Sequence, residues 1–277
     1  MRFSILFAAL LACAAEKYSA TGLVLRVDEP NRTVLVSCEA IAGHMDAKTI
    51  SVSVHDAREL AGLAPGLMVE FTLTLPYAAN IHVRKFEDLE QQGLSARRLK
   101  IVEDLDSPVH VLKIGESVPS AVLMDQDRKE LDVGGFEGKV VLMNFFYSHC
   151  PLPDYCFRLS NNLSNVRRRF HTRMGRDLIL LSVTFDPIHD QPEVLAKYAG
   201  TWKAGPDWHF LTGDLSEIQR FSKMFGVDAW PDETELMHSL HTVIIDRQKK
   251  LAANLEGNEF TARQLGDLVE TILDPNR

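Results

Sequence analysis

The stretch VVLMNFFYSHCPLPDYC, residues 140–156, decides the fold of this chain. It opens with an unbroken apolar run of β-type residues, which predicts a buried strand. The run ends shortly before Cys150, and a second cysteine, Cys156, comes after five intervening residues. A helical pattern from about residue 159 then predicts a strand–turn–helix unit. Both sulfurs should therefore lie at the carboxyl end of a strand, the edge of an α/β sheet where ligands usually bind.

Strands and helices alternate along the rest of the second half. LILLSVTF, residues 178–185, predicts a second fully buried strand. Further elements are predicted as a helix at 192–202, a strand at 208–211, a helix at 214–225, a hairpin at 241–256 and a last helix capped by Thr261. This order is thioredoxin-like, so we expect an α/β, thioredoxin-like domain over residues 111–277.

The first half predicts a different domain. Alternating runs at 21–28 and 33–38 flank a turn and predict a hairpin, and three further short strands follow before residue 86. Residues 17–86 therefore predict a small all-β domain, a barrel of the oligonucleotide/oligosaccharide-binding type. Residues 87–110 are mixed and charged, and we interpret them as a linker.

Residues 1–16 predict a signal peptide. Arg2 precedes an apolar run that is too short to span a bilayer, and small residues follow it. LLAC, residues 10–13, also resembles a lipobox, in which Cys13 would be acylated and would anchor the mature protein to a membrane. Under either form of cleavage we expect a periplasmic or other extracytoplasmic protein.

Charge and cysteine count narrow the function. The formal net charge is −8 and no sustained basic patch is visible, which argues against a nucleic-acid partner. The chain has four cysteines, and without Cys13 the remaining three cannot form a disulfide scaffold for a chain this long. In an exported protein, the close pair Cys150 and Cys156 indicates chemistry.

A cysteine at the amino end of a helix has a lowered pKa, and the thiolate is the nucleophile and the metal ligand. Cys150 and Cys156 are therefore candidates for a reversible redox disulfide or for binding a soft ion such as Cu(I). A plain stabilising disulfide is the third alternative.

A metal held by two sulfurs needs a further ligand, and histidines at the same sheet edge are the candidates. They are His149, His189, His238 and His241. We favour His238, which we expect in a loop just before the strand at 242–246, with Met237 as an auxiliary soft ligand. His149 should point to the opposite face, and His241 is interpreted as a half-buried histidine with its hydrogen bonds satisfied.

Three separated motifs resemble the Sco/SenC family of thioredoxin-fold copper proteins. They are residues 138–151, residues 184–195 and residues 237–239. The resemblance covers residues 111–273. It implies that Cys150, Cys156 and His238 bind copper, as Cu(I) or Cu(II), and that the protein delivers copper to a respiratory oxidase subunit or reduces the thiols of its copper site.

The chain departs from the family pattern at several positions. Five residues rather than three separate the cysteines, Phe157 stands where proline is common, and Met237 stands where aspartate often precedes the ligand histidine. Asp186 and Asp190 are interpreted as turn and cap residues.

The β-domain is similar to a CusF-like periplasmic copper-binding domain. Cys38 stands where that family has its histidine, and Lys48 and Ile50 stand where methionines are expected. Cys38, His44 and Met45 remain as soft ligands, and we state a second copper site there as a hypothesis.

The favoured reading is an exported copper chaperone that transfers its ion by ligand exchange. The first alternative is a metal-free thiol–disulfide oxidoreductase in which Cys150 and Cys156 are catalytic, and whether the protein is an enzyme stays open. A docking module without chemistry is the second alternative.

Overall fold

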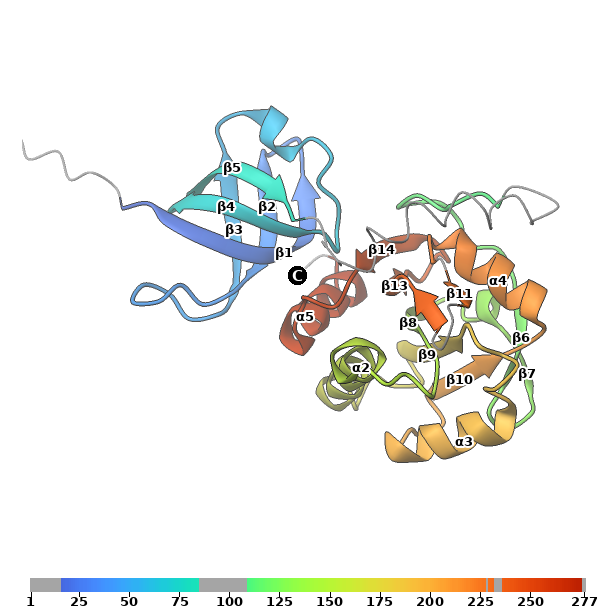
Figure 1. Cartoon of the computed structure of the whole chain (residues 1–277). Helices are drawn as coiled ribbons and strands as arrows, with labels where there is room; N and C mark the ends of the chain where they lie inside the picture. The colour runs from blue at the N-terminus through green and yellow to red at the C-terminus, as the bar shows by residue number, and fades with distance from the viewer. Residues whose placement is uncertain (1–15, 85–108, 228, 232–235, 276–277) are drawn as a thin grey trace, which may run out of the picture.

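The computed structural model describes residues 16–84, 109–227, 229–231 and 236–275, and Figure 1 shows them as two domains joined side by side. Most of the predicted signal peptide and of the predicted linker lies outside the described residues, as does Cys13. The boundaries at 16, 86 and 110 therefore stay predictions. None of the helices in the described part of the chain is long and apolar enough to cross a membrane.

The N-terminal domain is a closed barrel with strand order β1-β2-β3-β5-β4, which confirms the all-β prediction. Its elements are β1 (Tyr18–Asp28), β2 (Thr33–Cys38), β3 (Thr49–Val54), the short helix η1 (Ala57–Leu60), β4 (Met68–Thr74) and β5 (Tyr77–Val83). Alternate residues of these strands fill the interior, among them Val36, Val52 and Phe71. Closure leaves the barrel without exposed sheet edges.

The second domain is built on a seven-stranded sheet in the order β14-β13-β8-β9-β10-β6-β7. Its strands are β6 (Val122–Asp125), β7 (Glu130–Asp132), β8 (Val140–Phe146), β9 (Leu178–Thr184), β10 (Trp208–Thr212), β13 (His241–Ile245) and β14 (Leu251–Glu256). Its helices are η3 (Val133–Gly135), α2 (Arg158–Arg169), α3 (Pro192–Thr201), α4 (Leu215–Met224) and α5 (Ala262–Leu273). This arrangement confirms the predicted thioredoxin-like α/β fold.

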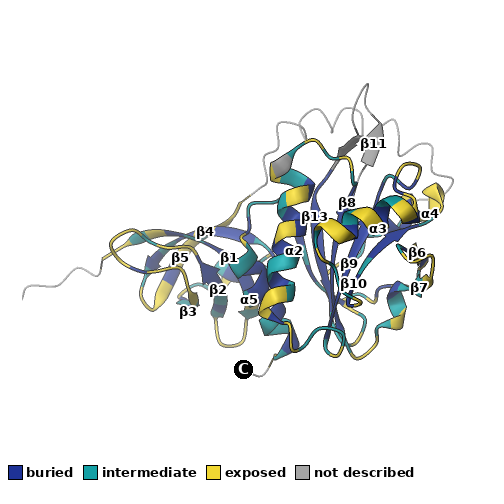
Figure 2. Cartoon of the chain, turned by 90° about the horizontal axis from the view of Figure 1, so that it is seen from below, coloured by how far each residue is buried: buried dark blue, intermediate teal, exposed yellow. Residues whose placement is uncertain are grey.

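Strands β8 and β9 lie in the middle of the sheet, and helices cover both faces of the sheet there. The two strands pair in parallel, from Val140 opposite Leu178 to Phe146 opposite Thr184, and every residue in both is buried. Phe146 stacks on Tyr198 of α3, whereas its neighbour Phe145 packs on Phe221 of α4. Figure 2 shows these buried strands lying between the helices. Burial on both faces explains the continuous apolar runs in the sequence.

The structure corrects the interpretation of residues 236–238 as a loop. They form strand β12 (Leu236–His238), which pairs antiparallel with β11 (Ala229–Pro231) in a separate two-stranded sheet. The short strands β6 and β7, the last two at one side of the sheet, were likewise not predicted. Strands of three or four residues are too short to show a periodic pattern, so sequence alone could not distinguish them from loops.

The two domains share one apolar core. Leu23, Leu25 and Met68 of the barrel belong to the same buried cluster as the sheet of the second domain. Helix α5 contacts β1 and β2, and it lies between the barrel and the sheet in Figure 1. The turn before β4 also approaches β14 closely, because a Cβ on Gly66 would come within 3.2 Å of the Leu255 side chain. A shared core of this kind fixes the barrel against the second domain.

Candidate functional site

Cys150 and Cys156 bound a loop, residues 150–156, that we call the cysteine loop. It follows β8 at the carboxyl edge of the sheet and ends in a single π-helical turn, η4 (Pro153–Phe157). Tyr155 has non-helical angles within this turn (φ −104, ψ −109), and the regular helix α2 begins only at Arg158. This irregular geometry at Tyr155 accommodates the five residues between the cysteines before α2 begins, and both sulfurs stay at the same edge of the sheet.

The two thiols are in contact but differ in burial. Cys156 has no exposed surface and belongs to the core, whereas Cys150 is half-buried, with its Sγ 3.7 Å from the Leu152 carbonyl oxygen. A hydrogen bond with Cys150 and burial raise the pKa of the Cys156 thiol well above its ordinary value. Among the described cysteines none is in a disulfide. Cys150 therefore carries the accessible sulfur. The Cys156 thiol loses its proton only when its sulfur forms a disulfide bond or binds a cation.

A buried carboxylate fixes the start of the cysteine loop. Asp190 has no exposed surface, and its carboxylate accepts hydrogen bonds from the Ser148 backbone N–H at 3.0 Å, from the Ser148 hydroxyl and from the Thr184 hydroxyl at 2.6 Å. Asp190 thus joins the end of β9 to the residue two positions before Cys150. The interpretation of Asp190 as a simple turn or cap residue missed this contact. The sequence signal was an acidic residue just after a buried strand at the same sheet edge.

Two of the candidate histidines lie near this edge but have other partners. The exposed His149 ring contacts the Ser148 hydroxyl oxygen through Nδ1 at 2.8 Å. The exposed His189 ring contacts the Asp186 carboxylate through Nδ1 at 2.9 Å.

The structure describes the side chain of His241 but only the backbone of His238. The buried His241 ring contacts the Asn254 side-chain oxygen at 2.9 Å, in agreement with its interpretation as a satisfied histidine. His238 is the last residue of β12, opposite Ala229, and its side chain lies outside the described residues. Among the side chains that are described, no group of three His, Cys, Asp or Glu residues lies close enough to hold a metal ion. The ligand role of His238 stays a prediction.

The barrel residues proposed as a second copper site lie in different environments. Cys38 and Met45 are buried in the barrel core, whereas His44 is exposed and its ring stacks on Tyr18 at a centroid distance of 3.7 Å. Burial raises the pKa of the Cys38 thiol to about 12. Because Cys38 and Met45 lie in the apolar interior while His44 is exposed, these contacts favour a packing role for Cys38. Copper binding by Cys38, His44 and Met45 stays an untested hypothesis.

Comparisons with known proteins concern the second domain. Residues 118–274 match the model of the SCO1/SenC family. A SCO2-like protein of Rickettsia typhi is 30% identical over 146 residues, which cover 50% of this chain and 68% of that protein. A putative copper-binding protein of Stutzerimonas stutzeri is 32% identical over 125 residues, which cover 43% of this chain and 57% of that protein.

A solved structure supports the fold of this domain. BsSco, described as a member of the Sco family of cytochrome c oxidase assembly proteins, superposes with a TM-score of 0.50 at 22% identity. The match covers 59% of this chain and 97% of BsSco, a protein in which a disulfide switch has been identified. At this identity the likeness concerns the fold alone.

Proposed function

Since the chain belongs to the SCO1/SenC family, we propose that it binds copper at Cys150 and Cys156 and takes part in the assembly of cytochrome c oxidase. The observation that carries the proposal is the contact between two thiols of unequal burial at the carboxyl edge of the sheet. Thiolates are the soft ligands that Cu(I) prefers. The fit is also electrostatic. Cys156 acquires a negative charge when it loses its proton, and a bound cation would compensate that charge.

The unequal burial of the two sulfurs suits transfer of an ion. The half-buried Cys150 is within reach of a thiolate from a partner, whereas Cys156 is held in the core. We propose that copper leaves by ligand exchange that begins at Cys150, with an oxidase subunit as the acceptor. His238 is proposed as the third ligand, from the separate strand β12.

A second candidate function rests on the same asymmetry. In a thiol–disulfide oxidoreductase, the Cys150 thiolate would attack a partner disulfide, and Cys156 would then attack the mixed disulfide and release the reduced partner. This reaction needs one accessible and one resolving thiol, which is the arrangement seen here. If the partner disulfide is formed by the copper-site cysteines of the oxidase, this reaction would also serve oxidase assembly.

We also propose export of the protein with a lipid anchor on Cys13. The supporting observations are the apolar run, the small residues that follow it and the LLAC motif. Mass spectrometry of the mature N-terminus would show an acylated Cys13 as the first residue. An unmodified N-terminus at another residue would contradict the lipid anchor.

Anaerobic Cu(I) titration against a competing chelator tests the copper proposal. We expect about one Cu(I) per reduced chain, loss of this binding in Cys150→Ser and Cys156→Ser, and a weakening of about tenfold or more in His238→Ala. Cys38→Ser is the matched control, since it removes a thiol from the same chain but should leave this binding unchanged. Unchanged stoichiometry in either Cys150→Ser or Cys156→Ser would exclude this copper site.

The same variants separate the candidate functions. An oxidoreductase would reduce a disulfide substrate in the presence of a copper chelator and in His238→Ala, and it would lose this activity in Cys150→Ser. A docking module would show neither copper binding nor disulfide reduction and would still bind a partner.

A further inference from the structure

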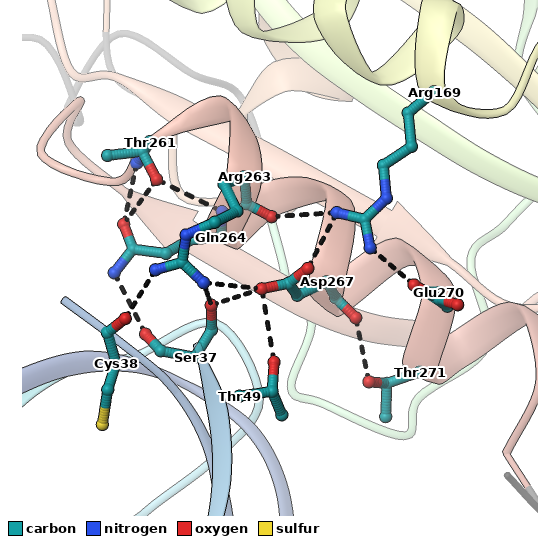
Figure 3. Close-up of polar contacts among 10 residues, drawn as sticks. All are labelled: Ser37, Cys38, Thr49, Arg169, Thr261, Arg263, Gln264, Asp267, Glu270 and Thr271. Carbon is teal, nitrogen blue, oxygen red and sulfur yellow. Dashed lines mark hydrogen bonds and ion pairs between the residues drawn. The ribbon is translucent and has the colours of Figure 1, made fainter. Parts of the chain in front are cut away.

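The first turn of α5 is held by the barrel through main-chain and side-chain hydrogen bonds. Arg263 donates to the Ser37 hydroxyl at 2.9 Å and to the Cys38 carbonyl oxygen, and Figure 3 draws both contacts. Gln264 donates from Nε2 to the Ser37 carbonyl oxygen at 3.2 Å. Ser37 and Gln264 have no exposed surface, so water cannot replace the bond between them without opening the interface.

Gln264 also closes the amino end of its own helix. Its Oε1 accepts from the Thr261 backbone N–H at 2.9 Å, while the Thr261 hydroxyl accepts from the Gln264 N–H at 3.2 Å. This reciprocal capping box fixes the residue at which α5 begins. One glutamine side chain therefore ties the start of α5 to the barrel.

The chain just before this helix start, residues 257–260, contacts the cysteine loop. The Asn258 side-chain amide donates to the Asp154 carbonyl oxygen, and Asp154 lies between Cys150 and Cys156. The neighbouring Gly257 N–H donates to the Leu240 carbonyl oxygen at 2.9 Å, two residues after His238. The 257–260 loop thus contacts both chain segments that carry the proposed copper ligands.

The same loop is anchored at two further points. The Asn162 amide of α2 donates to the Phe260 carbonyl oxygen at 3.2 Å, and Phe260 is buried. Arg84 of the barrel forms an ion pair with Glu259 at 3.3 Å, and both side chains are more than one third exposed. An exposed ion pair contributes little stability, so the barrel acts on this loop mainly through the buried contacts at α5.

We propose that Asn258 is a positioning residue for the Cys150/Cys156 pair and that the barrel braces this pair through the first turn of α5. The proposal rests on the proposed function insofar as the pair is the working site, but the redox equilibrium of the pair tests it without copper. The N-terminal domain is then a part of the site's support and not an independent module.

The brace affects the equilibrium between thiols and disulfide. The sulfur atoms are in hydrogen-bond contact without a covalent bond, and a disulfide requires them to approach to about 2.05 Å. The Asn258 bond to Asp154 holds the cysteine loop in the conformation of the reduced pair, so in this proposal it stabilises the dithiol. With oxidised glutathione, the two thiols form the disulfide while two electrons and two protons pass to the oxidant, which yields two molecules of reduced glutathione.

Asn258→Ala in the full chain tests the positioning role. In copper-free glutathione redox buffers, we expect the equilibrium to shift about threefold to tenfold toward the disulfide, the effect of losing one hydrogen bond. Asn165→Ala is the matched control. Its amide also donates to a backbone carbonyl, that of Asn161, but on α2 and without contact with the cysteine loop. An equal equilibrium in wild type and Asn258→Ala would overturn the proposal.

Two arginine variants test the barrel's part. Arg263→Gln removes contacts at the start of α5, whereas Arg26→Gln removes a bond from the barrel to the Pro275 carbonyl oxygen beyond the other end of that helix. We expect Arg263→Gln to shift the equilibrium in the same direction as Asn258→Ala and Arg26→Gln to leave it within about twofold of wild type. The double variant Asn258→Ala/Arg263→Gln should equal Asn258→Ala, because both changes act through one contact.

These outcomes are separable from those of the copper titration. A shifted equilibrium in Asn258→Ala together with no Cu(I) binding by the wild type would support the brace and exclude the copper proposal. Normal Cu(I) binding by the wild type with an unchanged thiol–disulfide equilibrium in Asn258→Ala would support the copper proposal and exclude the brace. An equal shift in Arg26→Gln and Arg263→Gln would refute transmission through the first turn of α5.

Discussion

The cysteines of the two domains lie in opposite settings. Cys38 is at the end of a barrel strand and fully buried in an apolar interior, where its pKa rises to about 12. Cys150 is half-buried at the start of the cysteine loop, in contact with a second sulfur and two residues after Ser148, which donates to a buried carboxylate. The difference shows that burial together with neighbouring groups, and not residue type, decides which thiol is available for chemistry.

The largest expected difference between these thiols is in their rate of alkylation. At pH 8, iodoacetamide should modify Cys150 more than about 10³-fold faster than Cys38, because Cys38 reacts only after the barrel opens. Peptide mass spectrometry of the copper-free, reduced chain over time measures both rates. Similar rates at the two positions would show that the barrel core is open to the reagent.

The next effect concerns the support of the cysteine loop by Asp190. Asp190→Asn replaces a buried carboxylate that accepts three hydrogen bonds, so we expect a loss of about 2–3 kcal/mol in the free energy of unfolding. Urea denaturation measures the loss. The matched control is Asp214→Asn, because the exposed Asp214 side chain makes no capping hydrogen bond. If Asp190→Asn lowers the free energy of unfolding by no more than about 0.5 kcal/mol beyond Asp214→Asn, the supporting role of Asp190 is contradicted.

The smallest effect, counted for each pH unit, is the pH dependence that Cys38 contributes. Its folded pKa of about 12 exceeds the ordinary value of 9.0, so above pH 9 the unfolded state loses the proton first. The contribution of the protonated thiol is complete below pH 9, and it falls by about 1.4 kcal/mol per pH unit as the pH rises from 9 toward 12. The free-energy difference between wild type and Cys38→Ala should shrink at this rate in urea denaturation series. A constant difference from pH 7 to pH 11 would contradict the raised pKa.

The main elements of the fold could be predicted because their sequences carry their own signals. Residues 140–146 and 178–184 are apolar at every position except Asn144, Ser182 and Thr184, as burial on both faces demands. The alternating strands of the barrel and the Thr261 cap of α5 are equally local features. The strands of the β11–β12 pair, by contrast, are too short for a periodic pattern to indicate them.

For the site itself, the sequence by itself determined the two sulfurs, their place after a buried strand and the candidate histidines. Only the tertiary structure decided that Cys156 is buried while Cys150 is accessible, that Asp190 holds Ser148, and that Asn258 contacts Asp154. It also decided that the barrel grips the first turn of α5. The physical reason is separation along the chain. Ser148 and Asp190 are 42 residues apart, and Asp154 and Asn258 are 104 apart, so no local pattern of polarity or spacing can indicate that they meet.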